Sequence, residues 1–255
     1  MMPRMAGTGG TETYGAALAR LRAAQKSAKG VSLYSRWVNR PAGRLLAAAA
    51  HRAGLHPHHV TGLSALCSFA AVAAVALARP SWPLALAVWA GLFIGFALDA
   101  ADGQLARLRG ESSPAGEWLD HAVDCAKITA LHAAVLVSFH RFFDLPGEGW
   151  LLVPLLFQLA AVLIFFGGLL TDKLKRAQET SAPAPAPPPS RLRALALLPV
   201  DYGVLCALFL LLGAPGAFRI GYAALCAVYV VFCAAFSVKW FRELSALNAS
   251  STPLS

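Results

Sequence analysis

Six long apolar runs, separated by short breaks that contain proline, glycine or charged residues, dominate the chain. They cover residues 59–78, 82–105, 117–139, 150–171, 195–213 and 217–238. A helix needs about 20 apolar residues to cross the hydrocarbon core of a bilayer, and each run approaches that length. The pattern therefore predicts an all-α integral membrane protein with six transmembrane helices, contained in one domain over residues 57–242.

The segments before the first run are polar and basic. Residues 1–30 are rich in Gly, Ala, Arg and Lys, and we expect a flexible basic N-terminus. Over residues 31–56, apolar positions such as Trp37 alternate with arginines such as Arg40, which predicts an amphipathic helix lying in the membrane interface, broken at Pro41. An ordinary solvated helix is the alternative, because the apolar face is narrow.

Two further polar segments flank the later runs. Residues 177–193 contain the stretch SAPAPAPPPS and predict a stiff Pro-rich linker on the cytoplasmic side. Residues 243–255 are expected to form a C-terminal tail.

Composition agrees with the membrane assignment: 57% of residues are hydrophobic and 14% are charged. Soluble domains carry about 25% charged residues, so a soluble enzyme is excluded. The net charge of +9 does not indicate nucleic acid, because the cations flank apolar runs and form no stripe with aromatic residues. If the N-terminus is cytoplasmic, 18 of the 22 Lys and Arg residues lie inside and three outside, which places both termini in the cytoplasm.

Four aspartates stand out against this apolar background, at the adjoining ends of the second and third runs: Asp99, Asp102, Asp120 and Asp124. Helical spacing puts the first two on one face of their helix and the last two on one face of the next. A turn joins the helices, with Ser113 as the expected N-cap and Pro114 in the first turn. An ionised side chain inside a membrane helix costs about 2.5–3.5 kcal/mol, so these acids require bound positive charge.

Carboxylate oxygens are hard ligands that favour Mg²⁺ or Mn²⁺ over zinc, and two divalent ions would balance four carboxylates. A structural salt network is the alternative, with Arg107, Arg109 and Lys127 as the only nearby cations. The small residues Gly103, Ala106 and Gly116 clear space beside the acids, and the guanidinium of Arg107 suits bidentate binding of phosphate. Together these residues predict a metal-bridged diphosphate site.

The stretch reads D-x-x-D-G-x-x-A-R-x(8)-G-x(3)-D-x(3)-D from residue 99 to residue 124. This resembles, at all eight positions, the signature of the CDP-alcohol phosphatidyltransferase family. The resemblance implies a homodimeric enzyme of phospholipid biosynthesis, located in the bacterial cytoplasmic membrane with its active site facing the cytoplasm. Such an enzyme transfers a substituted phosphate from a CDP-linked lipid donor to a polar alcohol acceptor and releases CMP.

The resemblance also implies roles for individual residues. Metal ligation is implied for Asp99, Asp102, Asp120 and Asp124, with Asp124 also acting as general base. CDP binding is implied for Asp102, Gly103, Ala106, Arg107 and Gly116. The family's P-N-x-V-T segment appears at residues 57–61 with His58 in place of Asn, which adds Thr61 to the expected CDP-binding residues.

The acceptor is expected to be inositol phosphate or glycerol phosphate, and the donor CDP-diacylglycerol. Residues 34–41 resemble the opening of family members that handle inositol phosphates. Two residues are candidates for the acceptor site, and each has an alternative. Lys127 either binds an acceptor phosphate or pairs with Asp124. Asp201, with Tyr202 beside it, either contacts an acceptor hydroxyl or is a helix-end acid near Arg191 and Arg193.

Two other functions remain open from the residues alone. Paired intramembrane acids also line ion pathways, so a divalent-cation transporter is the first alternative. That function predicts acids near the bilayer midplane on several helices, whereas the four motif acids lie on two. The second alternative is an inactive scaffold that dimerises through its helices.

Overall fold

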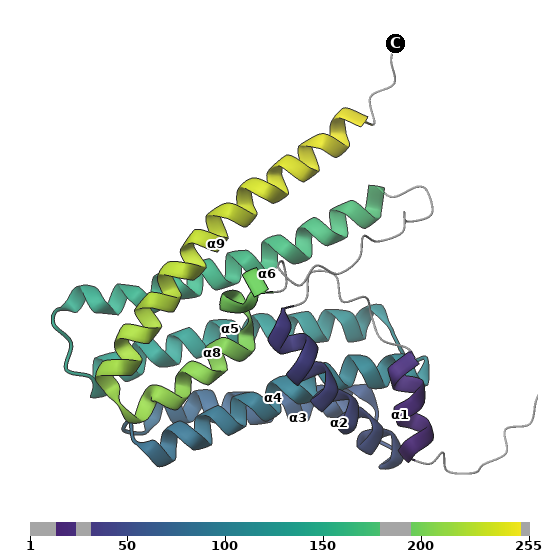
Figure 1. Ribbon diagram of the computed structural model, residues 1–255, viewed down its shortest axis with the longest axis horizontal. Helices are drawn as coiled ribbons and strands as arrows, with labels where there is room; N and C mark the ends of the chain where they lie inside the picture. Colours follow the sequence, from purple (N-terminus) through teal and green to yellow (C-terminus); the bar gives the residue numbers. More distant parts are fainter. Residues whose placement is uncertain (1–13, 24–31, 179–194, 251–255) are drawn as a thin grey trace, which may run out of the picture.

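The structure is a computed structural model, and it describes residues 14–23, 32–178 and 195–250. Within these ranges every regular element is a helix, and the long helices lie side by side in one bundle (Figure 1). The predicted Pro-rich linker over 177–193 falls almost entirely outside the described residues.

Five helices are long and apolar enough to cross a bilayer, which confirms an all-α integral membrane protein. They are α3 (Pro57–Leu77), α4 (Trp82–Arg109), α5 (Pro114–Phe142), α6 (Leu152–Gln178, preceded by a 3₁₀ turn over Glu148–Leu151) and α9 (Pro215–Ser250). The first four and the last of the predicted apolar runs lie within these helices, except for at most two residues at an end. Helix α9 continues through most of the predicted C-terminal tail.

The remaining run, 195–213, does not form a single long helix, so the predicted count of six spans is not confirmed. It divides into a 3₁₀ turn (Leu198–Val200), helix α8 (Tyr202–Leu208) and a second 3₁₀ turn (Phe209–Gly213). The apolar helical stretch Tyr202–Gly213 reaches only about 20 Å at 1.5–2.0 Å per residue, whereas a bilayer core is about 30 Å thick. Asp201 caps its start, and Pro215 follows its end.

The N-terminal region contains more helix than the sequence predicts. Helix α1 (Tyr14–Ala23) lies inside the segment expected to be flexible, because it buries Ala17 and Leu21 against α2 (Arg40–Arg52) and α4. Whether α2 lies in a membrane interface stays a prediction; its buried face consists of small residues, and Trp37 just before it is 67% exposed.

Pro41 does not break the interfacial helix, contrary to the prediction. A π-helical turn over Ser35–Asn39 precedes it, and the Arg40 backbone N–H donates to the Ser35 carbonyl. Proline clashes with the carbonyl four residues earlier in a regular α-helix, and the wider π turn gives that carbonyl room. The chain therefore runs into α2 without interruption.

Close packing between α3 and α4 sets the position of the acidic motif. A Cβ atom at Gly95 would lie 3.2 Å from the backbone carbonyl oxygen of Ser64 and closer still to the Ser68 hydroxyl, so only glycine fits there. Small residues at helix crossings are typical of membrane bundles. The close approach brings polar side chains of α3 to the carboxylates that α4 carries one and two turns later.

Candidate active site

The acidic motif lies where α4 and α5 meet through a tight turn. Helix α4 ends at Gly110, which has a φ of 68° in the left-handed region that favours glycine. The Ser113 hydroxyl accepts a hydrogen bond from the Gly116 N–H at 3.1 Å, and Pro114 occupies the first turn of α5. The predicted cap and proline position are both confirmed, and the two helices run antiparallel with their acids facing each other.

A hydrogen bond also fastens this turn to the start of α3. His56 Nδ1 lies 3.2 Å from Glu111 Oε2, and this interaction, with Arg109 nearby, holds the pKa of the exposed Glu111 carboxyl below its usual range. The turn is therefore tied to the segment that carries Pro57 and Thr61.

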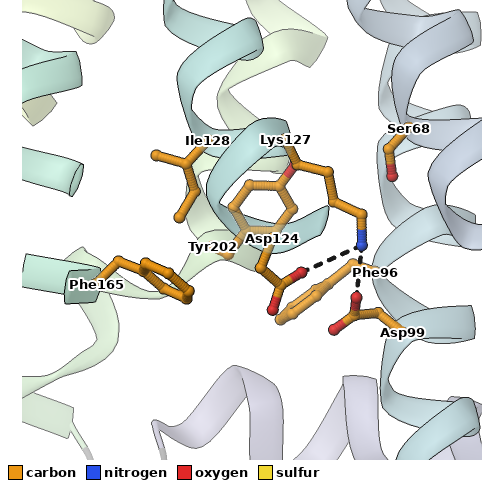
Figure 2. Close-up of a pocket in the computed structure, with 8 residues that line it drawn as sticks. All are labelled: Ser68, Phe96, Asp99, Asp124, Lys127, Ile128, Phe165 and Tyr202. Atoms are coloured by element: carbon orange, nitrogen blue, oxygen red, sulfur yellow. Dashed lines mark hydrogen bonds and ion pairs between the residues drawn. The ribbon is translucent and has the colours of Figure 1, made fainter. Parts of the chain in front are cut away.

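Three of the four motif acids form one cluster. Single carboxylate oxygens of Asp99, Asp120 and Asp124 all lie within 4.8 Å of one another. Lys127 points into the cluster: its Nζ lies 2.5 Å from Asp99 Oδ1 and 3.2 Å from Asp124 Oδ1 (Figure 2). The lysine is buried and also donates to the Ser64 hydroxyl at 3.0 Å. One ammonium group thus pairs with two of the three clustered carboxylates.

The fourth acid, Asp102, is buried one turn along α4 and lies outside that three-carboxylate cluster. Its Oδ2 accepts a hydrogen bond from the Thr61 hydroxyl at 2.6 Å. Thr61, predicted to bind CDP, therefore holds the orientation of a motif carboxylate. Asp102 borders the same pocket as Asp120.

The larger of two neighbouring pockets encloses about 520 Å³ on the side of the α4–α5 turn. Pockets for small molecules commonly measure about 300–1,000 Å³, so this one has room for a nucleotide. All the expected CDP-binding residues line it: Thr61, Asp102, Gly103, Ala106, Arg107 and Gly116. A Cβ atom at Gly103 would lie 3.5 Å from a terminal nitrogen of Arg107, so glycine leaves that face of the pocket open.

The smaller pocket encloses about 170 Å³ and lies deeper in the bundle. Asp99, Asp124 and Lys127 line it together with mainly apolar side chains of α4, α5, α6 and α8 (Figure 2). The acid cluster stands between the two pockets, because Asp120 borders the larger and Asp124 the smaller. The clustered carboxylates therefore border both pockets.

The residues present fit a divalent cation. Three clustered carboxylates supply the hard oxygen donors that such ions prefer, and Lys127 contributes one positive charge, beside Asp99 and Asp124. Asp99, Asp120 and Asp124 are the residues that would hold the ion, with Asp102 beside them. Of the structural salt network considered from the sequence, the described residues show the pairs of Lys127 with Asp99 and Asp124.

The sequence matches the profile of the CDP-alcohol phosphatidyltransferase family over residues 55–236. The chain belongs to this family. It is accordingly a transferase, and the cation-transporter and scaffold alternatives are set aside. The four motif acids also lie on two helices only, α4 and α5. A cation-transport pathway predicts acids on several helices.

Two solved structures share the fold of this family member. Mycobacterium tuberculosis phosphatidylinositol phosphate synthase (PgsA1) with CDP-DAG bound is 21% identical, with 78% of this chain and 90% of that chain covered and a TM-score of 0.50. The same synthase in complex with manganese and citrate is 17% identical, with 80% and 89% covered and a TM-score of 0.54. No curated protein sequence matches the chain.

The two candidate acceptor residues of this transferase occupy different environments. Lys127 lines the smaller pocket and pairs with Asp99 as well as with Asp124. Asp201 is buried and is the N-cap of α8, where it accepts from the Gly203 N–H at 2.7 Å. Arg191 and Arg193, its suggested partners, lie outside the described residues.

Several pocket residues are not predicted from the sequence. Phe96 and Phe165 line the smaller pocket, and His58 and Arg176 line the larger one. Tyr202, which the sequence pairs with Asp201 as a candidate acceptor contact, also lines the smaller pocket. Within an apolar run, the sequence does not distinguish an apolar or aromatic residue that lines a pocket from one that faces lipid. His58 does carry a signal, since it stands in the segment that resembles the family's P-N-x-V-T.

Proposed function

We propose that this enzyme transfers a phosphatidyl group from CDP-diacylglycerol to a hydroxyl group of a polar alcohol and releases CMP. The observation that carries the proposal is the acid cluster between two pockets, with every CDP-binding residue of the motif on the larger one. The similar PgsA1 structure that holds CDP-DAG supports a CDP-lipid donor. Glycerol phosphate and inositol phosphate are the acceptors we propose.

In this mechanism the larger pocket binds the CDP part of the donor. Arg107 forms charge-assisted hydrogen bonds to the diphosphate, and the lack of a side chain at Gly103 and Gly116, which both line this pocket, lets the nucleotide approach the helix backbones. Thr61 holds the Asp102 carboxylate in place through its hydrogen bond. Donor binding therefore places the reacting phosphorus beside the acid cluster.

Asp124 acts as the general base, since it borders the smaller pocket where the acceptor enters. The acceptor oxygen forms a bond to the phosphorus that carries diacylglycerol, and its proton passes to the Asp124 carboxylate. The bond from that phosphorus to the CMP oxygen breaks, and CMP leaves with the electron pair. Lys127, held between Asp99 and Asp124, keeps both carboxylates in place.

Mg²⁺ or Mn²⁺ bound by the four aspartates, as two ions, would neutralise the diphosphate and the charge that develops on CMP. The similar structure that contains manganese supports this assignment. We also propose a homodimer in the bacterial cytoplasmic membrane, with the active site and both termini facing the cytoplasm, as the distribution of cations favours.

The test uses the purified full chain in detergent with CDP-diacylglycerol, Mg²⁺ or Mn²⁺, and a panel of glycerol 3-phosphate, inositol phosphate, glycerol and inositol. We expect acceptor-dependent release of CMP and a phosphatidyl product of matching mass. Absence of CMP with every acceptor and both metals would contradict the proposal.

A further inference from the structure

A buried hydroxyl group on α3 holds the ammonium of Lys127 inside the acid cluster. The Ser64 side chain is fully buried and accepts a hydrogen bond from Lys127 Nζ at 3.0 Å. Ser64 donates its own proton to the backbone carbonyl of Gly95 on α4, at 2.8 Å. A serine hydroxyl has one proton to donate, so with that proton on Gly95 its oxygen meets the lysine as an acceptor. Ser64 therefore fixes where the ammonium stands.

The other two partners of the ammonium are carboxylates. Lys127 Nζ donates to Asp99 Oδ1 at 2.5 Å and to Asp124 Oδ1 at 3.2 Å (Figure 2). A lysine ammonium has three N–H donors, and the two carboxylates and Ser64 use all three. The lysine side chain is only 5% exposed, and a charge buried to this degree needs such partners. In this arrangement the ammonium has no N–H left for another ligand.

The same two carboxylates belong to the candidate site for a divalent cation. Asp99 and Asp124 are two of the three acids whose oxygens lie within 4.8 Å of one another, and Asp120 is the third. An ion held by this cluster would share Asp99 and Asp124 with the ammonium. Because like charges repel, the ammonium opposes the binding of the ion that the carboxylates favour.

We propose that Lys127 and Ser64 together lower the affinity of the acid cluster for divalent cations. Lys127 supplies a competing positive charge, and Ser64 is the positioning residue that holds this charge between Asp99 and Asp124. The inference rests on the proposed function, because it concerns the Mg²⁺ or Mn²⁺ assigned to that reaction. Its consequence for the enzyme is that filling the site takes a higher concentration of metal than the carboxylates alone would need.

The test measures binding of Mn²⁺ to the purified full chain in detergent, by the loss of the electron paramagnetic resonance signal of free Mn²⁺. Lys127→Met removes the competing charge, and we expect the Kd for Mn²⁺ to fall at least about tenfold. Ser64→Ala removes one hydrogen bond that holds the ammonium but keeps both ion pairs. We expect its Kd for Mn²⁺ to fall about threefold to tenfold, the size of one hydrogen bond.

Ser68→Ala is the matched control. Ser68 lies one turn further along α3, is buried like Ser64 and packs against the same glycine, Gly95. Its hydroxyl makes no hydrogen bond to any described residue, so its loss should leave the Kd for Mn²⁺ unchanged. An unchanged Kd in Lys127→Met, or an equal decrease in Ser64→Ala and Ser68→Ala, would overturn the proposal.

The double variant separates positioning from a general loosening of the crossing between α3 and α4. Because Ser64 acts through Lys127, adding Ser64→Ala to Lys127→Met should not change the Kd for Mn²⁺ any further. Additive decreases, or no decrease in Ser64→Ala alone, would overturn the positioning role of Ser64. If the Kd values shift as expected but wild type releases no CMP with any acceptor, only the proposed function fails. If no variant binds Mn²⁺, the proposal fails together with the metal assignment.

Discussion

The burial of Lys127 between two carboxylates lets us predict how much stability the protein loses when this lysine is replaced. Replacement by methionine leaves an unbranched side chain one heavy atom shorter and removes the charge that pairs with Asp99 and Asp124. At an effective dielectric constant of about 20, unit charges at these separations of 2.5 and 3.2 Å attract by about 7 and about 5 kcal/mol. Most of that attraction offsets desolvation of the three groups.

Removing one partner of a buried ion pair usually costs about 3–5 kcal/mol net. For a protein of this size, 1 kcal/mol corresponds to about 2–4 °C, so Lys127→Met should melt about 6–20 °C below wild type in EDTA. Divalent cations supply the missing positive charge. Saturating Mn²⁺ should therefore raise the melting temperature of the variant more than that of wild type.

The measurement is thermal unfolding of both proteins in detergent, followed by tryptophan fluorescence, in EDTA and in Mn²⁺. Lys173→Met is the matched control, because Lys173 pairs with Glu117 at 2.7 Å where both side chains are nearly half exposed. Exposed pairs contribute about 0–1 kcal/mol, so this variant should melt close to wild type. A Lys127→Met protein that matches Lys173→Met in both conditions would refute the role of Lys127 as the counterion.

Three further predictions concern other parts of the site. Gly203→Ala should destabilise the protein by about 1–3 kcal/mol, seen as a lower melting temperature, because its Cβ would overlap the Tyr34 ring. His56 lowers the pKa of Glu111 in the folded protein, so the ionised carboxylate stabilises the fold above the unfolded pKa of about 4.3, and this stabilisation is lost as the pH falls through the folded pKa. Glu111→Gln should lack this loss, which melting temperatures measured over a series of acidic pH values would show. Arg107→Lys should raise the donor KM at least about tenfold in the CMP assay, since lysine cannot make bidentate hydrogen bonds to phosphate, and an unchanged donor KM would remove Arg107 from the CDP site.

The parts of the site that sequence predicts are those governed by spacing along one helix. Asp99 and Asp102, three residues apart on α4, and Asp120 and Asp124, four apart on α5, share faces because of helical periodicity alone. The cap at Ser113 follows from local chemistry in the same way. Six of the eight motif residues line the larger pocket, and the other two, Asp99 and Asp124, line the smaller one.

The parts that sequence does not predict depend on contacts between distant elements. The pairing of Lys127 with Asp99 joins α5 to α4, and the placement of Tyr202 depends on Tyr34 packing against Gly203. The short helix over Tyr202–Gly213 has the composition of a span, and its length is set by the cap at Asp201 and by the 3₁₀ turns. The hydropathy of the sequence predicts none of these contacts, because each joins residues that are far apart along the chain or depends on a local cap.

The account depends most on Asp124 as the base at the junction of the two pockets. The decisive measurement is CMP release from CDP-diacylglycerol with Mn²⁺ and the preferred acceptor, for wild type, Asp124→Asn and the exposed control Asp144→Asn. Loss of a general base should slow Asp124→Asn by about 10²–10⁴-fold, with Asp144→Asn near wild type and all three proteins folded. CMP release by Asp124→Asn at the wild-type rate would contradict the account.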